Sequence, residues 1–384
     1  MSRAPVYLDC HATTPLDPRV LDAMLPYFTE HFGNPASSTH QWGWKAQSAV
    51  EQARRQVAAI IGASAREIVF TSGATESNNL ALAGAVALVD PQRTRIVISA
   101  IEHKSVIEIA ARLGAAGREV IVVPVDRDGL LDLAALASAI DGRTAAVSVM
   151  AANNEIGVIQ PVTEIGRLAR EAGALFHVDA AQAVGKMPID VQAMGIDLLS
   201  LTGHKIHGPK GCGALFVRKH VSIEPNMIGG GHERGVRAGT LNVPGIVGLG
   251  AACALATTEM AADCSRIAAL RDRLLAGLRS GLDGVAVNGS MTHRLPNNLH
   301  VSFTGVDGES LLVGIGDIAV STGSACSSAA GIPSHVLSAM MGAEPVPSAS
   351  IRFGLGRFTT QDDVDYAVER FTTLVRHLRQ MAPV

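Results

Sequence analysis

The feature that most constrains the fold is a regular alternation of short apolar runs with longer segments that have apolar residues at helical spacing. Five apolar runs of strand length carry this pattern: 67–72, 95–99, 119–123, 144–150 and 174–179. Strands that alternate with helices in this way indicate a mainly parallel sheet with helices on both faces. We therefore expect an α/β fold.

The chain is long enough for more than one domain. It has 384 residues, of which 47% are hydrophobic and 17% charged, which excludes a disordered protein. A long helical region from about residue 245 to residue 282 is expected to lead out of the large domain, and the remainder mixes strands with helices. We predict an N-terminal segment packing with the small domain (1–15), a large domain (16–258) and a small C-terminal domain (259–384).

Charge and composition exclude several classes of partner. A formal net charge of -3 without a basic block argues against nucleic acid or an anionic membrane surface. The N-terminus lacks an apolar signal region, and the apolar stretch Leu80–Val89 is too short to span a bilayer, so we expect a cytoplasmic protein. The cysteines are odd in number and lack a Cys-x-x-Cys pair, so neither disulfides nor a metal site is expected: Cys10, Cys212, Cys253, Cys264 and Cys326.

Polar residues follow the ends of several predicted strands. In a mainly parallel sheet, ligands bind beyond the carboxyl ends of the strands, where these side chains would meet. Each position alone could be a helix cap or a satisfied loop residue. Together they predict a binding site formed by residues 71–75, His103, residues 153–155, Asp179 and Gln182.

Two of these positions indicate particular ligand groups. Gly73, Ala74 and Thr75 follow a strand and open a helix, where free backbone N–H groups and the helix dipole favour a phosphate. An ordinary capped turn has the same pattern. Asp179 closes an apolar strand, where a carboxylate needs a cation such as a protonated pyridine nitrogen, although an N-cap is an equally good interpretation.

A polar turn between two further apolar runs carries two lysines, Lys205 and Lys210, within residues 200–211. The pattern predicts a strand, a turn and a strand. Partial burial and cationic neighbours would lower the pKa of a lysine at such a sheet edge and make it a nucleophile. A solvated hairpin tip with two surface lysines is the alternative.

Three later segments add candidates. The glycine-dense loop 229–240 is either flexible or brings the Thr240 hydroxyl to a phosphate. Arg352 alternates with apolar residues on a predicted strand, so its guanidinium could face a cleft and clamp a carboxylate, or face solvent. Cys326 lies in a run of small residues, which indicates a mobile loop with an accessible thiol.

Taken together, these segments resemble the cysteine desulfurases of the NifS/IscS group, pyridoxal-phosphate enzymes of the class V aminotransferase superfamily. The resemblance covers nearly the whole chain and rests on motifs at 71–77, 153–157, 177–182, 203–211, 229–240 and 323–328. It implies the PLP-dependent transferase fold type I, with a large domain built on a mainly parallel seven-stranded sheet and a smaller α+β C-terminal domain. Cys10 and His11 depart from the pattern, which usually has an aromatic residue or Asn followed by a small or polar residue.

The resemblance assigns roles around a pyridoxal 5'-phosphate. Lys205 would bind the cofactor covalently, His103 would stack on its ring, and Asp179 would pair with the ring nitrogen. Gln182 and Asn154 would contact the ring oxygen and its surroundings. By the same resemblance, Lys205 rather than Lys210 is the reactive lysine.

It also assigns the phosphate and substrate contacts. The phosphate would be held by Ala74, Thr75, Thr202 and His204, with Thr240 reaching in from a second subunit, which implies a homodimer. Asn34, Asn154 and Arg352 would bind the substrate L-cysteine, with Asn34 and Arg352 on its carboxylate. The catalytic residues would be Lys205, His103 and Cys326.

The implied reaction converts L-cysteine to L-alanine. Lys205 would remove and return protons, and the Cys326 thiolate would take the substrate sulfur as a persulfide. The persulfide would pass to an acceptor protein such as an iron–sulfur scaffold, where Cys326 could transiently contact an iron–sulfur cluster. The alternatives are a selenocysteine lyase, another class V enzyme, or a non-enzymatic sulfur carrier that uses Cys326 alone.

Overall fold

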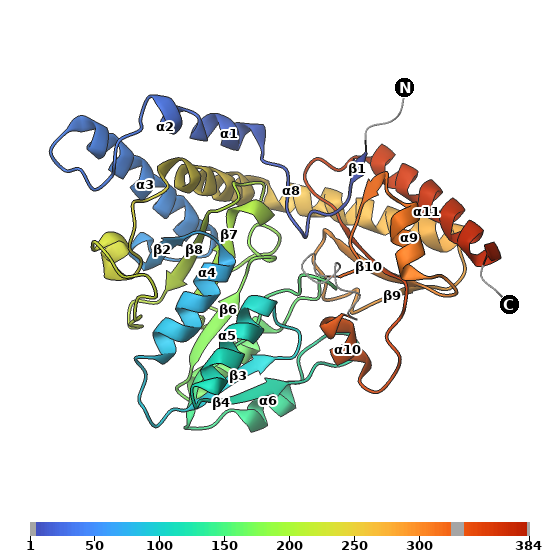
Figure 1. Cartoon of the computed structure of the whole chain (residues 1–384), viewed down its shortest axis with the longest axis horizontal. Helices are drawn as coiled ribbons and strands as arrows, with labels where there is room; N and C mark the ends of the chain where they lie inside the picture. Colours follow the sequence, from blue (N-terminus) through green and yellow to red (C-terminus); the bar gives the residue numbers. More distant parts are fainter. Residues whose placement is uncertain (1–4, 324–333, 382–384) are drawn as a thin grey trace.

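The computed structural model describes residues 5–323 and 334–381, and its large domain is built on a seven-stranded sheet (Figure 1). All its strands run in the same direction except β8, which is antiparallel to both of its neighbours, β2 and β7. The predicted mainly parallel sheet is therefore confirmed. In spatial order the strands are β2 (Ile68–Thr71), β8 (Gly213–Val217), β7 (Leu198–Thr202), β6 (Leu175–Asp179), β5 (Thr144–Ser148), β3 (Arg95–Ser99) and β4 (Glu119–Val123).

Helices connect and cover these strands. The helix after β2 changes to π-helical geometry after six residues, a feature that the sequence pattern did not predict. Short 3₁₀ turns are η1 (Ala65–Glu67), η3 (Gly203–Lys205) and η4 (His232–Gly235). The helices of the large domain are α1 (Pro18–Met24), α2 (Pro26–Thr29), α3 (Gln41–Ile60), α4 (Ala74–Asn79) with the π-helix η2 (Leu80–Gly84), α5 (Lys104–Ala115), α6 (Leu133–Ala139) and α7 (Val162–Glu171).

The C-terminal part forms a smaller α+β unit. A three-stranded antiparallel sheet has the order β12 (Ser350–Gly354), β10 (Asn298–Phe303) and β9 (Val285–Val287). Near it, the N-terminal strand β1 (Val6–Tyr7) pairs in parallel with β11 (Ile318–Ala319), and Cys10 donates its backbone N–H to Gly354 O at 2.9 Å. The helices of this part are α9 (Gly308–Gly314) and α11 (Gln361–Met381), whereas α10 (His335–Met341) packs its buried side chains into the core of the large domain.

The long helix α8 (Val243–Gly281) runs through both parts of the molecule (Figure 1). By length and mean hydropathy, 1.4 in its most apolar window, it could cross a membrane. The sequence did not single out this helix as an apolar segment, because its many small residues make it inconspicuous. Its first half packs in the core of the large domain and its second half in that of the small one, so we assign it to the interior.

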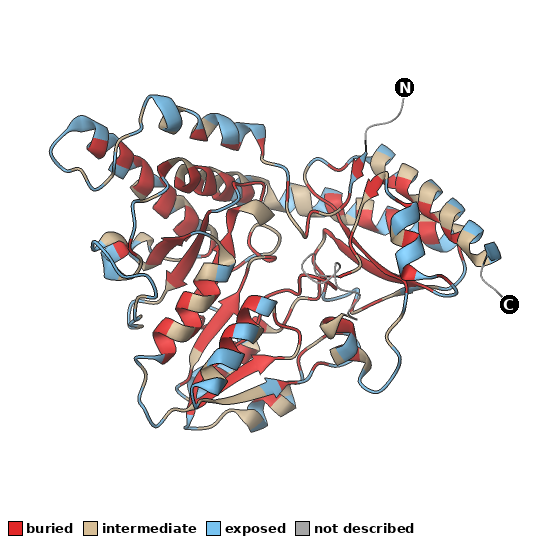
Figure 2. Ribbon diagram, viewed as in Figure 1, coloured by how far each residue is buried: buried red, intermediate tan, exposed pale blue. Residues whose placement is uncertain are grey.

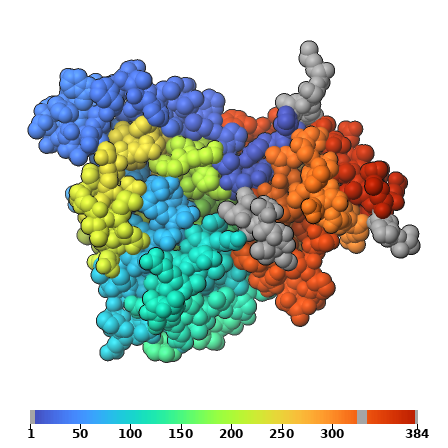
Figure 3. All heavy atoms as spheres, viewed as in Figure 1, coloured from blue at the N-terminus to red at the C-terminus, as the bar shows by residue number. Residues whose placement is uncertain are grey.

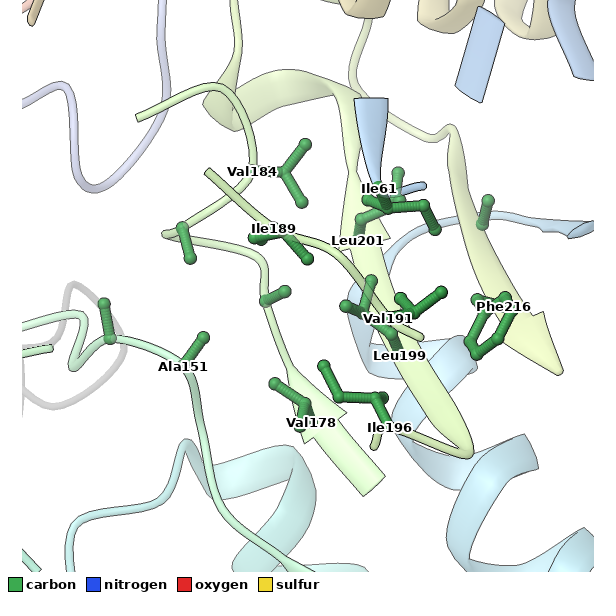
Figure 4. Packing of buried hydrophobic residues seen from close by; sticks show 14 of the residues in the cluster. Ile61, Ala151, Val178, Val184, Ile189, Val191, Ile196, Leu199, Leu201 and Phe216 are labelled. Carbon is green, nitrogen blue, oxygen red and sulfur yellow. The ribbon is translucent and has the colours of Figure 1, made fainter. Parts of the chain in front are cut away.

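The largest hydrophobic cluster lies against the large sheet. Figure 2 shows its strands as mostly buried. Figure 4 shows Val178 of β6, Leu199 and Leu201 of β7 and Phe216 of β8 within this cluster. A second hydrophobic cluster, which includes Phe353 of β12, fills the small domain. The sheet is thus a rigid support for the turns that end its strands.

Candidate active site

A cavity of about 490 Å³ opens where the predicted strand-end residues meet. It is bounded by both parts of the chain, because the N-terminal segment and β12 reach it from the side of the small domain. Of the predicted residues, it brings together Ala74, Thr75, His103, Asn154, Asp179, Gln182, Thr202, His204, Lys205 and Arg352.

Lys205 lies in the cavity wall at the end of η3, directly after β7. Its Nζ donates hydrogen bonds to the backbone oxygens of His11 and of Ala12, the latter at 2.6 Å. Burial, followed by the positive charges of Lys186 and Arg352, lowers the pKa of Lys205 to about 7. The amine is therefore a nucleophile near neutral pH.

A cradle for a phosphate lies at the start of α4. Gly73 has φ 152° and ψ 178°, a conformation that favours glycine, and the helix offers no acceptor to the N–H groups of Ala74 and Thr75. Strand β8 passes close to this turn, since a Cβ on Gly213 would come within 2.6 Å of the Gly73 Cα. Burial lowers the pKa of His204 to about 4, so this ring is neutral.

Asp179 and His103 also line the cavity. Asp179 accepts hydrogen bonds from Asn78 Nδ2 at 2.7 Å and from the Ala181 N–H at 2.9 Å. Asn78 also donates to the Ser105 hydroxyl, which is 2.8 Å from His103 Nδ1. One network therefore orients both the acid and the imidazole.

Arg352 and Asn154 form another part of the wall. Arg352 is almost completely buried, and it donates to Asn154 O at 2.9 Å and to Asp9 Oδ1 at 2.8 Å. Among the described residues, Arg352 Nε and Asn154 Oδ1 have no hydrogen-bond partner although they are buried. Unpaired buried groups at a cavity indicate that a polar ligand completes them.

Two predicted site residues, Asn34 and Thr240, do not line the cavity. Asn34 lies in an exposed loop, where its Oδ1 accepts the Ala36 N–H at 2.9 Å. Thr240 is also exposed, near Arg237, which holds its loop to Glu76 at 2.9 Å. Cys326 lies outside the described residues.

Other important residues were missed. Lys186 is partly buried near the site, burial lowers its pKa to about 8, and its charge acts on Lys205. Glu102 is a buried carboxyl whose pKa is raised to about 8, mainly by burial. His11 lines the cavity and bonds Gln182, so the Cys10-His11 departure from the family pattern was the one signal pointing to it.

The residues present fit pyridoxal 5'-phosphate. The cradle of free N–H groups suits a phosphate, Asp179 suits a protonated ring nitrogen, and the neutral amine of Lys205 suits an aldehyde carbon. The unpaired Asn154 Oδ1 marks a further polar contact in the same cavity. Fold and site together define a pyridoxal-phosphate-dependent enzyme of transferase fold type I.

Comparison with known proteins narrows this class. The aminotransferase class-V family model matches residues 6–367. The cysteine desulfurase IscS of Anaeromyxobacter sp. (strain K) is 54% identical over 384 residues, which is all of this chain and 95% of that protein. A NifS-like protein of known structure has a TM-score of 0.91 at 38% identity, covering 97% of this chain and 100% of its own. A structure described as SspA in complex with cysteine has a TM-score of 0.80 at 34% identity, covering 92% and 100%.

The chain therefore belongs to the aminotransferase class-V family and, within it, to the cysteine desulfurases of the IscS and NifS group.

Proposed function

We propose that this enzyme removes the sulfur of free L-cysteine, releases L-alanine and holds the sulfur as a persulfide on Cys326. The observation that carries the proposal is that Lys205, whose pKa burial lowers to about 7, lines one cavity with the buried Arg352 and the carboxyl group of Asp179. The similarity to SspA, whose structure is described as a complex with cysteine, supports free cysteine as the substrate.

Each described residue has a defined task in this reaction. Arg352 binds the substrate carboxylate, and Ala74, Thr75, Thr202 and His204 hold the cofactor phosphate. The bound cofactor supplies a place for the negative charge that remains when the substrate α-carbon loses its proton. Lys205, once free as an amine, removes that proton and returns one at the carbon that becomes the alanine methyl group.

None of the described cysteines lines the cavity, and we assign the nucleophile of the sulfur transfer to Cys326. Its thiolate forms an S–S bond to the substrate sulfur while the carbon–sulfur bond breaks, and the carbon takes a proton. The products, L-alanine and a persulfide, account for all atoms of the substrate and need no external oxidant. The acceptor of this persulfide, which we propose to be a protein of iron–sulfur cluster assembly, is consistent with the similarity to IscS.

The test is incubation with L-cysteine while alanine, sulfide and protein-bound persulfide are measured. Cys326→Ala should keep the visible absorption of the cofactor on Lys205 but lose persulfide and sulfide. Cys264→Ala is the matched control, because Cys264 is the one partly exposed cysteine among the described residues, and it should behave as the native enzyme. Undiminished sulfide release by Cys326→Ala would refute the role of Cys326.

The same assay separates the alternatives. Turnover that depends on a keto acid would indicate an aminotransferase, and turnover of selenocysteine alone would indicate a selenocysteine lyase. A sulfur carrier without enzymatic activity would show no chromophore on Lys205. The cytoplasmic location stays a prediction from the sequence.

We further propose a homodimer in which Thr240 completes the phosphate site of the second subunit. The exposed position of Thr240 supports this, as do large apolar side chains left exposed on α2, on α3 and between them: Phe28, Phe32, Trp42 and Trp44. These helices form the blue corner of the molecule in Figure 3.

A mixture of two variants tests the arrangement. In a heterodimer of Lys205→Met with Thr240→Val, one site combines an intact Lys205 with an intact Thr240 only if Thr240 acts across the interface. Mixed dimers should then exceed the activity of the Thr240→Val homodimer. If mixing gives no gain, Thr240 acts within its own chain or not at all.

A further inference from the structure

A chain of hydrogen bonds with fixed direction runs from the small domain to the cavity. Arg294 Nη1 donates to Asn298 Oδ1 at 2.7 Å, and a guanidinium can only donate, so this contact identifies the amide oxygen. The amide nitrogen of Asn298 donates to Glu155 O at 2.9 Å, which agrees with that orientation. The same nitrogen lies 3.1 Å from His11 Nε2.

These contacts determine which ring nitrogen of His11 carries the proton. Burial, followed by the charges of Arg352 and Lys186, holds the pKa of His11 well below its ordinary value, so the ring is neutral. Nε2 faces a donor and must accept, which leaves the proton on Nδ1. Nδ1 lies 3.0 Å from Gln182 Oε1 and donates to it.

His11 holds the Gln182 amide on both sides. Its ring donates to Oε1, and its backbone oxygen accepts from Gln182 Nε2 at 3.0 Å. The second N–H of Nε2 meets no acceptor among the described residues, and Gln182 lines the cavity. A glutamine without such contacts could turn its amide by half a rotation and exchange donor for acceptor.

We propose that His11 is a positioning residue, which locks Gln182 so that it presents an N–H, and not a carbonyl, to the oxygen on the ring of the cofactor. The inference rests on the proposed function, which makes the cavity a pyridoxal-phosphate site. A donor at this point favours the ionised ring oxygen and lowers the apparent pKa of the chromophore that the cofactor forms with Lys205. A substitution of His11 leaves the charged groups that act on Lys205 unchanged: Lys186, Arg352, Asp9 and Asp179.

The experiment is a pH titration of the visible absorption of the resting holoenzyme, without substrate. His11→Leu removes the ring contact and leaves Gln182 held only by the backbone oxygen of residue 11. The apparent pKa of the chromophore should then rise by up to about one pH unit, the shift expected for a lost hydrogen bond to a charged group. His11→Asn keeps an amide N–H near the position of Nδ1 and should restore the native value. His11→Ala replaces the leucine variant if that variant does not fold.

A double variant tests whether His11 acts through Gln182. In Gln182→Leu protein, His11→Leu should cause no further shift, because both changes remove the same donor. His300→Leu is the control for the loss of a buried histidine, since His300 is fully buried, bonds Asn288 and does not line the cavity. It should lower stability without moving the chromophore pKa.

Two results would overturn the inference. One is an unchanged chromophore pKa in His11→Leu, and the other is an equal shift with and without Gln182. A native protein that forms no chromophore with pyridoxal phosphate would instead refute the proposed function.

Discussion

Lys205 should react as a neutral amine near pH 7 in the cofactor-free protein. The drop in its pKa from 10.5 to about 7 corresponds to about 5 kcal/mol against the charged form. Half of the amine is then neutral at pH 7, whereas for an ordinary lysine the neutral fraction is roughly one in three thousand. Burial is the largest cause and the charge of Lys186 the second. Lys186→Met should therefore move the pKa of Lys205 upward.

Reductive methylation with formaldehyde, in short pulses from pH 6 to pH 9.5, measures this property. Peptide mass spectrometry follows Lys205, and an added lysine peptide corrects for the pH dependence of the reagent. Modification of Lys205 relative to the peptide should be greatest at pH 6, the lowest pH of the series. It should fall steeply above pH 7, where Lys205 is already mostly neutral while the peptide amine is still deprotonating. A constant ratio up to pH 9 would refute the reasoning. An unchanged profile in Lys186→Met would exclude that charge as a cause.

Two further predictions concern stability, measured by urea unfolding. Burial raises the pKa of Glu102 from 4.5 to about 8, so the folded protein keeps a proton that the unfolded chain releases. The free energy of unfolding should then fall by about 1.4 kcal/mol per pH unit between pH 5 and pH 8. Glu102→Gln should lose that part of the pH dependence. Parallel slopes for the native protein and the variant would contradict the prediction. Glu233 pairs with buried Arg54 at 2.7 Å and accepts the Phe70 N–H at 2.8 Å, so Glu233→Gln should cost about 3–5 kcal/mol. Glu51 is partly exposed, and Glu51→Gln should cost less than about 1 kcal/mol. Similar losses in both variants would argue against a special role for the buried pair.

The fold was predictable because its signals are local. Each strand of the large sheet is a short apolar run followed by small or polar residues, and alternation with helices leaves few topologies. The antiparallel β8 follows from the short turn after β7, since a parallel return needs a longer crossover. The π-helix at Leu80–Gly84 was not predictable in this way, because an apolar helical run looks the same in either geometry.

The site was predictable only where topology gathers the ends of strands. His103, Asp179 and Lys205 follow three strands of the sheet and therefore meet. The contacts that set their chemistry join residues far apart in the chain, such as Lys205 with the backbone of Ala12, 193 residues away. Backbone carbonyls carry no sequence signal, and Lys186 is indistinguishable from a surface lysine until burial is known.

The geometry of Arg352 limits how a carboxylate can bind. Its Nη1 is used by the Asn154 carbonyl and its Nη2 by Asp9, whereas its buried Nε has no partner among the described residues. A carboxylate that binds the unpaired Nε together with a second nitrogen approaches the edge formed by Nε and Nη2, since Nη2 has a second N–H to donate. Arg352→Lys cannot offer this edge, because an ammonium lacks the planar fork, and the loss should fall mainly on KM. An unchanged KM for L-cysteine in that variant would mean that the substrate carboxylate binds elsewhere.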